Sequence, residues 1–205
     1  MFYLRDFVLI ASLVSALSAS AVQAHEHEHQ HHDKNETSEA VEPTKLSEES
    51  IYNLGSELLD SNGKKVSIVS LKGQPVVISM AYTSCAYACP LIISQMQQLE
   101  KEVEAQGLKA RFVIVSFDPK VDTPSVMKKY AEKRKLSSRW NLYTSSSDKT
   151  PREIANLLGI KYKKMEGNDY DHSFIITVLD KDGVIRGQQI GADKEPKELI
   201  KFLKN

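Results

Sequence analysis

Two cysteines four residues apart are the most reactive groups in this sequence. Cys85 and Cys89 are the only cysteines of the 205-residue chain, within Thr83-Ser84-Cys85-Ala86-Tyr87-Ala88-Cys89-Pro90. Thiolates bind soft metal ions and exchange with disulfides, so the pair can bind a metal, form a disulfide, or alternate between the two states. An i, i+4 spacing on a helical turn separates Cβ atoms by about 5–6 Å, whereas a disulfide prefers about 3.8 Å. We therefore expect a pair that accepts a metal ion and closes to a disulfide only with backbone adjustment.

One histidine can complete a metal site with this pair. His172 is the sole histidine after residue 32, and it lies just before the apolar segment Phe174 to Leu179. Two thiolates and an imidazole suit Cu(I) and can also hold Cu(II), whereas a structural zinc site needs four protein ligands. The sequence predicts a copper site of Cys85, Cys89 and His172. The alternatives are a structural disulfide for the cysteines and an ordinary surface position for the histidine.

The position of Cys89 favours a thiolate. Pro90 is typical of the first turn of a helix, so Cys89 is expected where a helix begins. Unpaired amide groups and the positive end of the helix dipole stabilise negative charge at such a position. We expect the pKa of Cys89 to be lowered.

A second group of histidines lies near the N-terminus. Residues 25–33 contain five imidazoles and several carboxylates, a composition that binds divalent transition metals. These histidines are auxiliary candidate ligands, and a hydrophilic tether with incidental metal affinity is the alternative; they are His25, His27, His29, His31 and His32. If a signal peptide is cleaved after Ala24, His27 becomes the third residue, and the α-amine, two amides and its imidazole could hold Cu(II).

The first 50 residues contain a pattern that predicts export. Residues 1–24 resemble a secretory signal peptide, with an apolar stretch from Phe7 to Val22 and small residues before the cleavage position at Ala24. We expect an exported, periplasmic protein, tethered to the membrane if the segment is not cleaved. Residues 25–50 form a predicted disordered, His-rich acidic tether, and residues 51–205 form a single predicted domain. Formal charge is balanced, with 27 basic and 27 acidic residues, and gives no argument for a nucleic-acid partner.

The elements that must position the site alternate between strands and helices. Their order predicts an α/β domain of thioredoxin-like fold with an added N-terminal β-hairpin. The cysteine segment joins a buried strand to a helix, a type of junction where reactive groups are exposed. The predicted elements are strands at Leu58–Asp60 and Val66–Leu71 around an Asn62-Gly63 turn, a buried strand at Pro75–Tyr82, a helix from Pro90 to Gly107, a strand at Phe112–Phe117, a helix from Thr123 to Leu136, a strand at Trp140–Tyr143, a helix at Pro151–Leu158, a hairpin of Phe174–Leu179 and Val184–Ile190, and a last helix carrying Leu199, Ile200 and Leu203.

Three motifs together resemble the Sco/SenC family of copper chaperones, which take part in assembling the dinuclear copper centre of cytochrome c oxidase. They are Tyr82 to Pro90, Ser116-Phe117-Asp118-Pro119 with Asp122-Thr123-Pro124, and Asp171-His172-Ser173. The resemblance implies a thioredoxin-like fold, copper ligation by the two cysteines and His172, and Asp118 near the site. For Asp122 we expect turn or helix-cap chemistry.

The resemblance implies a metallochaperone that delivers copper to the copper-bearing subunit of cytochrome c oxidase, or matures that subunit. Another periplasmic copper protein could be the recipient, and thiol-disulfide reductants are expected partners. The alternative is an enzyme, a thiol-disulfide oxidoreductase with Cys85 and Cys89 as its catalytic redox pair. Copper buffering by the histidine segment is a further hypothesis. A peroxidase of peroxiredoxin type is disfavoured, because Ala86 stands where a Thr would precede Cys89 by three residues.

Overall fold

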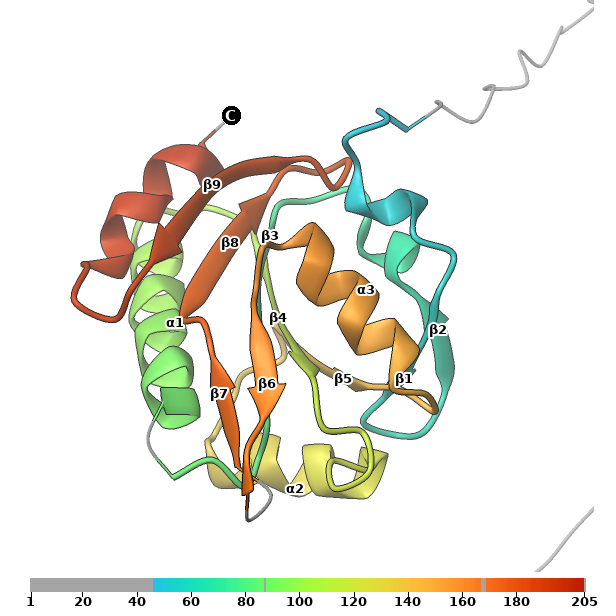
Figure 1. The fold of residues 1–205 in the computed structure, drawn as a ribbon. Helices are drawn as coiled ribbons and strands as arrows, with labels where there is room; N and C mark the ends of the chain where they lie inside the picture. Colours follow the sequence, from blue (N-terminus) through green and yellow to red (C-terminus); the bar gives the residue numbers. More distant parts are fainter. Residues whose placement is uncertain (1–45, 87, 167–168, 205) are drawn as a thin grey trace, which may run out of the picture. The chain divides into compact units, whose positions relative to one another are not determined.

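A seven-stranded sheet forms the centre of the domain in this computed structural model, which describes residues 46–86, 88–166 and 169–204. The strand order is β2-β1-β5-β4-β3-β8-β9, and β6 pairs with β7 in a separate two-stranded hairpin (Figure 1). The strands are β1 (Glu57–Asp60), β2 (Lys65–Ser67), β3 (Val76–Ala81), β4 (Arg111–Ser116), β5 (Trp140–Thr144), β6 (Tyr162–Lys164), β7 (Tyr170–His172), β8 (Ile175–Leu179) and β9 (Ile185–Ile190).

The middle of the sheet is buried on both faces. All six residues of β3 are buried, as the apolar and β-branched sequence of this strand predicts. β3 pairs in parallel with β4, and β4 in parallel with β5, whereas β8 pairs antiparallel with β3. The cysteine segment therefore leaves the carboxyl end of a central strand, the position where parallel sheets expose functional groups.

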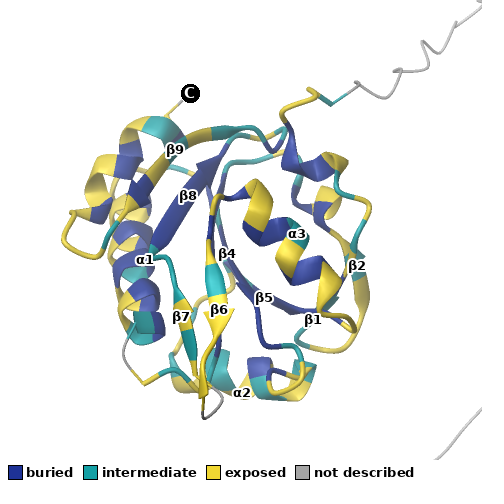
Figure 2. Cartoon of the chain, in the orientation of Figure 1, coloured by how far each residue is buried: buried dark blue, intermediate teal, exposed yellow. Residues whose placement is uncertain are grey.

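Helices cover this sheet and complete the core. Figure 1 shows α3 in front of the central strands, while α1 and the C-terminal helix η4 lie side by side. Figure 2 shows that α1, α3 and η4 each have both buried and exposed faces. The helices are η1 (Ile51–Asn53), η2 (Ile68–Leu71), α1 (Ala88–Ala105), α2 (Pro124–Lys133), α3 (Lys149–Leu157) and η4 (Pro196–Leu203), of which η1, η2 and η4 are 3₁₀-helices.

The predicted α/β class and the added N-terminal hairpin are confirmed. β1 pairs antiparallel with β2, and β1 also joins the main sheet by pairing antiparallel with β5. The predicted signal peptide and most of the predicted tether lie outside the described residues. Ser50, at the end of the predicted tether, is buried and accepts a hydrogen bond from the backbone of Tyr52 as the N-cap of η1.

Several element boundaries differ from the sequence prediction. The predicted strand Val66–Leu71 ends at Ser67 and continues as η2, because Ile68 and Leu71 are both buried, and residues three apart share a face in a 3₁₀-helix but not in a strand. Helix α1 begins two residues before Pro90. The predicted end of α2 at Leu136 is also wrong, because Lys135 adopts a positive φ of 53° and ends the helix.

The β6–β7 hairpin was absent from the sequence prediction. Tyr162 pairs with His172 and Lys164 with Tyr170, so the last residue of β7 is the candidate histidine. Both strands are short and largely solvent-facing, as Figure 2 shows, and they lack the alternating apolar pattern that identifies a strand. This hairpin projects beside the carboxyl end of β3 and carries one ligand of the candidate site.

Candidate metal centre

The cysteine segment holds its two sulfurs at different depths. Cys89 lies in the first turn of α1 and is fully buried, whereas Cys85 lies in the preceding loop and is half-buried. The backbone N–H of Tyr82 donates to Cys89 Sγ at 3.3 Å, and the backbone N–H of Cys89 donates to Cys85 Sγ at 3.4 Å. The two sulfurs are thiols with no disulfide between them. Main-chain donors at a strand-to-helix junction therefore orient both sulfurs.

The hairpin brings His172 to this pair. His172 Nε2 lies 3.8 Å from Cys89 Sγ, across a separation of 83 residues in the chain. Its other ring nitrogen, Nδ1, lies 3.2 Å from the carbonyl oxygen of Ser173, which accepts a hydrogen bond when Nδ1 is protonated. In that tautomer Nε2 carries a lone pair on the side of the sulfurs, and the hydrogen bond from Nδ1 to the carbonyl fixes the orientation of the ring for metal binding. The ring packs against Phe117, with centroids 5.2 Å apart.

The three candidate ligand atoms form one cluster. The sulfurs of Cys85 and Cys89 and a ring nitrogen of His172 all lie within 4.8 Å of one another, and no other such triad of His, Cys, Asp or Glu occurs in the described part of the chain. Metal–sulfur and metal–imidazole bonds are about 2.0–2.3 Å long, so ligand atoms around one ion are up to about 4.6 Å apart. Two soft sulfurs and one imidazole are a donor set suited to copper. The cluster therefore fits copper after only small adjustments.

The expected low pKa of Cys89 is wrong. Burial raises the pKa of the Cys89 thiol well above its ordinary value, and the backbone N–H of Tyr82 lowers it only in part. The helix dipole favours a thiolate at this position, but the complete burial of the side chain outweighs it. In the metal-free protein, Cys89 is therefore a thiol that must lose its proton to bind a metal.

Tyr82 joins the two halves of the site. Its hydroxyl donates to the carboxylate of Asp169 and accepts from the backbone N–H of Tyr170 at 3.3 Å, so it ties the start of β7 to the cysteine loop. This hydrogen bond holds the pKa of Asp169 below its usual range. The Tyr82 ring also meets those of Tyr170 and His172 edge-on. Sequence analysis missed this role because it did not predict the hairpin.

Asp122 braces the other side of the loop. Its carboxylate accepts hydrogen bonds from the backbone N–H and the hydroxyl of Thr83 and from the hydroxyl of Ser116. The side chain is fully buried, and burial raises its pKa despite these bonds. The expected helix-cap role is therefore wrong: the N-cap of α2 is Thr123, and the Asp122 carboxylate points back to the cysteine loop.

A model of the SCO1/SenC family matches residues 46–205. The match includes both cysteines and His172, and it covers most of the chain. The chain belongs to the SCO1/SenC family. The family membership expected from the three motifs is confirmed.

Similar proteins support this assignment for most of the domain. The SCO1 protein homolog of Bacillus subtilis (strain 168) is 31% identical over 145 residues, which are 69% of this chain and 75% of that protein. A SCO1/SenC family lipoprotein from Bacillus anthracis str. Ames is 26% identical with a TM-score of 0.67, over 73% of this chain and 93% of that one.

Two further similar structures are of a copper-bound protein and of a cytochrome c oxidase assembly protein. Bradyrhizobium japonicum ScoI, solved with copper bound, is 27% identical with a TM-score of 0.57, over 72% of this chain and 94% of that one. BsSco, described as having a disulfide switch and as a member of the Sco family of cytochrome c oxidase assembly proteins, is 26% identical with a TM-score of 0.65, over 78% of this chain and 96% of that one. The predicted thioredoxin-like fold is confirmed by these neighbours.

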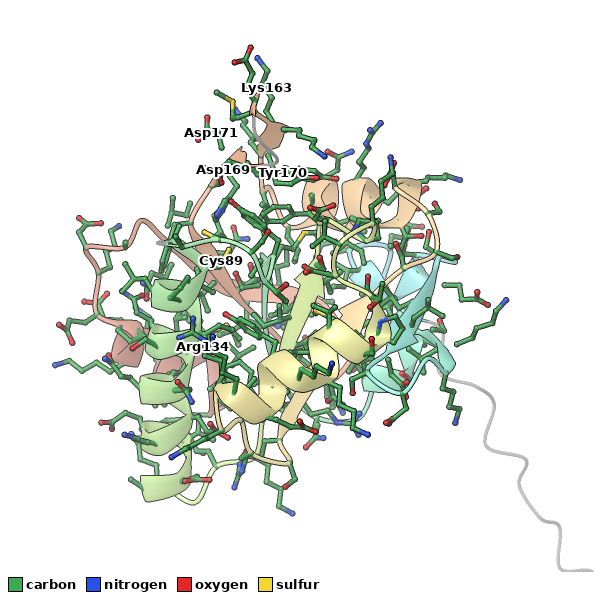
Figure 3. The ribbon with its side chains drawn as sticks, turned by 90° about the horizontal axis from the view of Figure 1, so that it is seen from below. Cys89, Arg134, Lys163, Asp169, Tyr170 and Asp171 are labelled. Atoms are coloured by element: carbon green, nitrogen blue, oxygen red, sulfur yellow. The ribbon has the colours of Figure 1, made fainter. Side chains whose placement is uncertain are left out.

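Asp118 lies beside the triad of this SCO1/SenC protein but is not part of it. It follows Phe117, whose ring contacts His172, and it is buried with its carboxylate oxygen Oδ2 lacking a hydrogen-bond partner among the described residues. Figure 3 shows the hairpin projecting from the domain, with Lys163 near its outer end and Cys89 toward the body of the protein. The position of Asp118 therefore favours a role near the site without direct metal ligation.

The N-terminal segment with the second group of histidines, at positions 25, 27, 29, 31 and 32, lies outside the described residues. Within residues 46–86, 88–166 and 169–204, no helix has the length and apolar character needed to cross a bilayer.

Proposed function

We propose that this protein is a copper chaperone that holds copper between Cys85, Cys89 and His172 and delivers it to the copper centre of cytochrome c oxidase. The convergence of two sulfurs and one imidazole within 4.8 Å carries the proposal. The copper-bound ScoI structure and the description of BsSco as a cytochrome c oxidase assembly protein support the metal and the pathway.

The burial of the three side chains suits a ligand that must be handed on. Cys89 is inaccessible to a partner, whereas Cys85 and His172 are half-buried and can be approached from outside. A recipient thiolate or imidazole can therefore displace these two ligands first, and Cys89 holds the ion until the last exchange. With three protein ligands, the ion keeps a coordination position that an incoming ligand can occupy.

Copper titration tests the proposed site. The reduced full chain, titrated anaerobically, is expected to bind one copper ion, and a Cys85→Ser/Cys89→Ser variant none at the domain site. His172→Ala should lower copper affinity strongly while keeping both thiols titratable. Equal affinity in the His172→Ala and unmodified proteins contradicts the proposed ligand set. In both proteins, the five histidines of residues 25–33 are changed to Gln, so that copper binding by that segment does not mask binding at the domain site.

We propose that the protein works outside the cytoplasm, exported and anchored or released according to the fate of residues 1–24. The signal-like pattern of those residues supports this location, and the similar B. anthracis protein is a lipoprotein. Mass spectrometry of the N-terminus of the protein isolated from its cells identifies whether cleavage follows Ala24. An intact N-terminus in a soluble cytoplasmic fraction contradicts export.

A thiol-disulfide oxidoreductase is the second candidate, favoured by the contact of the Cys89 N–H with Cys85 Sγ and by the disulfide switch described for BsSco. Cys85, the more accessible sulfur, attacks a partner disulfide as a thiolate and releases one partner thiol. Cys89, after losing its proton, then displaces the second thiol, so the partner gains two electrons and two protons while Cys85 and Cys89 become a disulfide. His172→Ala separates the functions, because it removes a metal ligand but neither sulfur.

A further inference from the structure

A large cleft lies next to the candidate metal centre. It is enclosed by α3, the β6–β7 hairpin and the segment Phe117–Lys120, and its volume is about 670 Å³. We call it the α3 cleft. Ligand pockets typically have volumes of about 300–1,000 Å³, so the α3 cleft can accept a short peptide segment.

The rim of the α3 cleft is basic. Five cations and two carboxylates line it, which gives a net formal charge of +3 (5 − 2); they are Lys120, Arg152, Lys161, Lys163 and Lys164, with Asp118 and Asp148. Lys120 pairs with Asp148 at 3.3 Å. In the described part of the chain, no ion pair joins the other four cations to a carboxylate. This rim therefore attracts a negatively charged ligand.

The floor of the cleft contains an unsatisfied acceptor. Asp118 is 1% exposed and lines the cleft, and its Oδ2 has no partner within hydrogen-bond distance in the described structure. Burial, and after it the Asp118 carboxylate, raises the pKa of the neighbouring Tyr170 hydroxyl. Leaving a buried acceptor unsatisfied costs about 1–3 kcal/mol, so a ligand that brings an N–H or O–H donor gains from this oxygen. Its charge also disfavours a bare phosphate or a nucleic acid. A peptide supplies both features, with backbone N–H donors for the floor and acidic side chains for the rim.

The wall of the cleft is shared with the metal centre. Phe117 and Tyr170 line the cleft, and their rings lie 5.1 Å apart. The same Phe117 ring lies 5.2 Å from the ring of His172. A segment bound in the cleft therefore lies one aromatic layer from a copper ligand, which is where a copper recipient needs to dock.

We propose that the α3 cleft is the docking site for an acidic, extended segment of the protein that accepts copper from this chain. The identity of the occupant as the copper recipient rests on the proposed function. The cleft's preference for an acidic peptide rests only on the charges, the acceptor and the volume described above.

Peptide binding tests the cleft without copper. The probe is a fluorescein-labelled peptide of alternating Glu and Gly, titrated with the full chain and followed by fluorescence anisotropy; its control has Gln in place of Glu. Lys161→Glu/Lys164→Glu should weaken binding of the Glu peptide about tenfold, since two exposed charge contacts become repulsive. The matched control Lys129→Glu/Lys133→Glu changes the net charge equally on exposed positions of α2 and should bind nearly as well as the unmodified chain.

Specific outcomes overturn the proposal. Equal weakening by the two double variants means that only net charge acts, and equal binding of the Gln peptide means that the rim does not select acids. Asp118→Asn should also weaken binding, because it replaces the buried acceptor with a group that carries a donor. If Asp118→Asn binds the Glu peptide with unchanged affinity, the Asp118 carboxylate does not contact the peptide.

Copper transfer then tests the partner's identity. Copper-loaded Lys161→Glu/Lys164→Glu protein should keep its copper absorption but transfer copper more slowly to the apo copper-bearing domain of cytochrome c oxidase from the same organism. Cys85→Ser/Cys89→Ser should lose copper yet still bind the Glu peptide. Loss of peptide binding in that variant places the peptide on the cysteines and overturns the cleft, whereas failed copper binding in the unmodified chain rejects only the proposed function.

The chain's own acidic segment is the competing occupant. Residues 25–45 contain six Asp or Glu residues. If they fill the cleft, changing all six to amides should tighten binding of the Glu peptide, and the cleft is then an internal site. Unchanged affinity is expected for a cleft that receives a partner.

Discussion

The two halves of the metal centre are held by different parts of the molecule. Cys89 belongs to the junction of β3 and α1, where the strand is completely buried and main-chain N–H groups orient both sulfurs. His172 belongs to a short, largely exposed hairpin that the Tyr82 hydroxyl and a few aromatic contacts attach to the domain. The sulfur half is therefore coupled to folding, whereas the imidazole half can change with little cost to the core. Substitutions on the sulfur side should therefore lower both the free energy of unfolding and copper affinity, whereas substitutions on the imidazole side should lower mainly copper affinity.

The largest effect is expected for Asp122→Ala on the sulfur side. The change leaves the N–H and hydroxyl of Thr83 and the hydroxyl of Ser116 without their buried acceptor. We expect a loss of about 3 kcal/mol in the free energy of unfolding, measured by urea denaturation, together with weaker copper binding. Asp122→Asn keeps an acceptor oxygen and should lose only about 1 kcal/mol. Full stability with weakened copper binding in Asp122→Ala contradicts the coupling.

The next effect is the pH dependence of copper binding. Because the pKa of Cys89 is raised by burial, copper binding at neutral pH displaces the Cys89 proton. Copper affinity should therefore increase as pH rises, by about tenfold per pH unit for each proton released. Competition with a chelator of known pH dependence measures the slope. A slope of zero across the neutral range means that Cys89 is already a thiolate or does not bind the metal.

Sequence patterns predicted the sulfur half better than the imidazole half. The buried strand and the proline in the first turn of α1 are local signals, and the structure has both, whereas Cys85 lies in the loop before α1 and not on the helical turn that the cysteine spacing suggested. The β6–β7 hairpin has almost no apolar alternation, so local patterns do not predict its strands. The position of His172 was expected near the sulfurs, but the tyrosine that holds it there was not.

Burial-dependent properties were also beyond local patterns. The helix dipole is visible in a sequence, whereas the complete burial that raises the pKa of Cys89 depends on how the loop and hairpin pack over it. Likewise, Asp122 has a position in the sequence that fits a helix cap. Only the tertiary structure brings Thr83 close enough to donate a hydrogen bond to the Asp122 carboxylate.

A smaller effect is expected on the imidazole side. Tyr82→Phe removes the hydroxyl that binds Asp169 and the backbone of Tyr170, so the hairpin should hold His172 less firmly. We expect copper affinity to fall by about fivefold, equivalent to roughly 1 kcal/mol, with little change in the free energy of unfolding. Tyr52→Phe is a matched control, because the buried Tyr52 hydroxyl has no hydrogen-bond partner in the described residues and lies outside the metal centre. Equal copper affinities of the two variants contradict the bracing role of Tyr82.

The smallest effect concerns the pH dependence of stability at Asp122. Its pKa is raised in the folded chain by burial, so between the ordinary Asp pKa and this raised value the folded protein binds more protons than the unfolded one. Asp122 therefore makes the protein less stable as pH rises through that window and has no further effect above it. The hydrogen bonds from Thr83 and Ser116 oppose burial and keep the effect small. Urea denaturation across mildly acidic pH should show that the stability of the unmodified chain, relative to Asp122→Asn, falls as pH rises. A relative stability that rises with pH means that the hydrogen bonds outweigh burial and that the loop is held by an ordinary, readily ionised carboxylate.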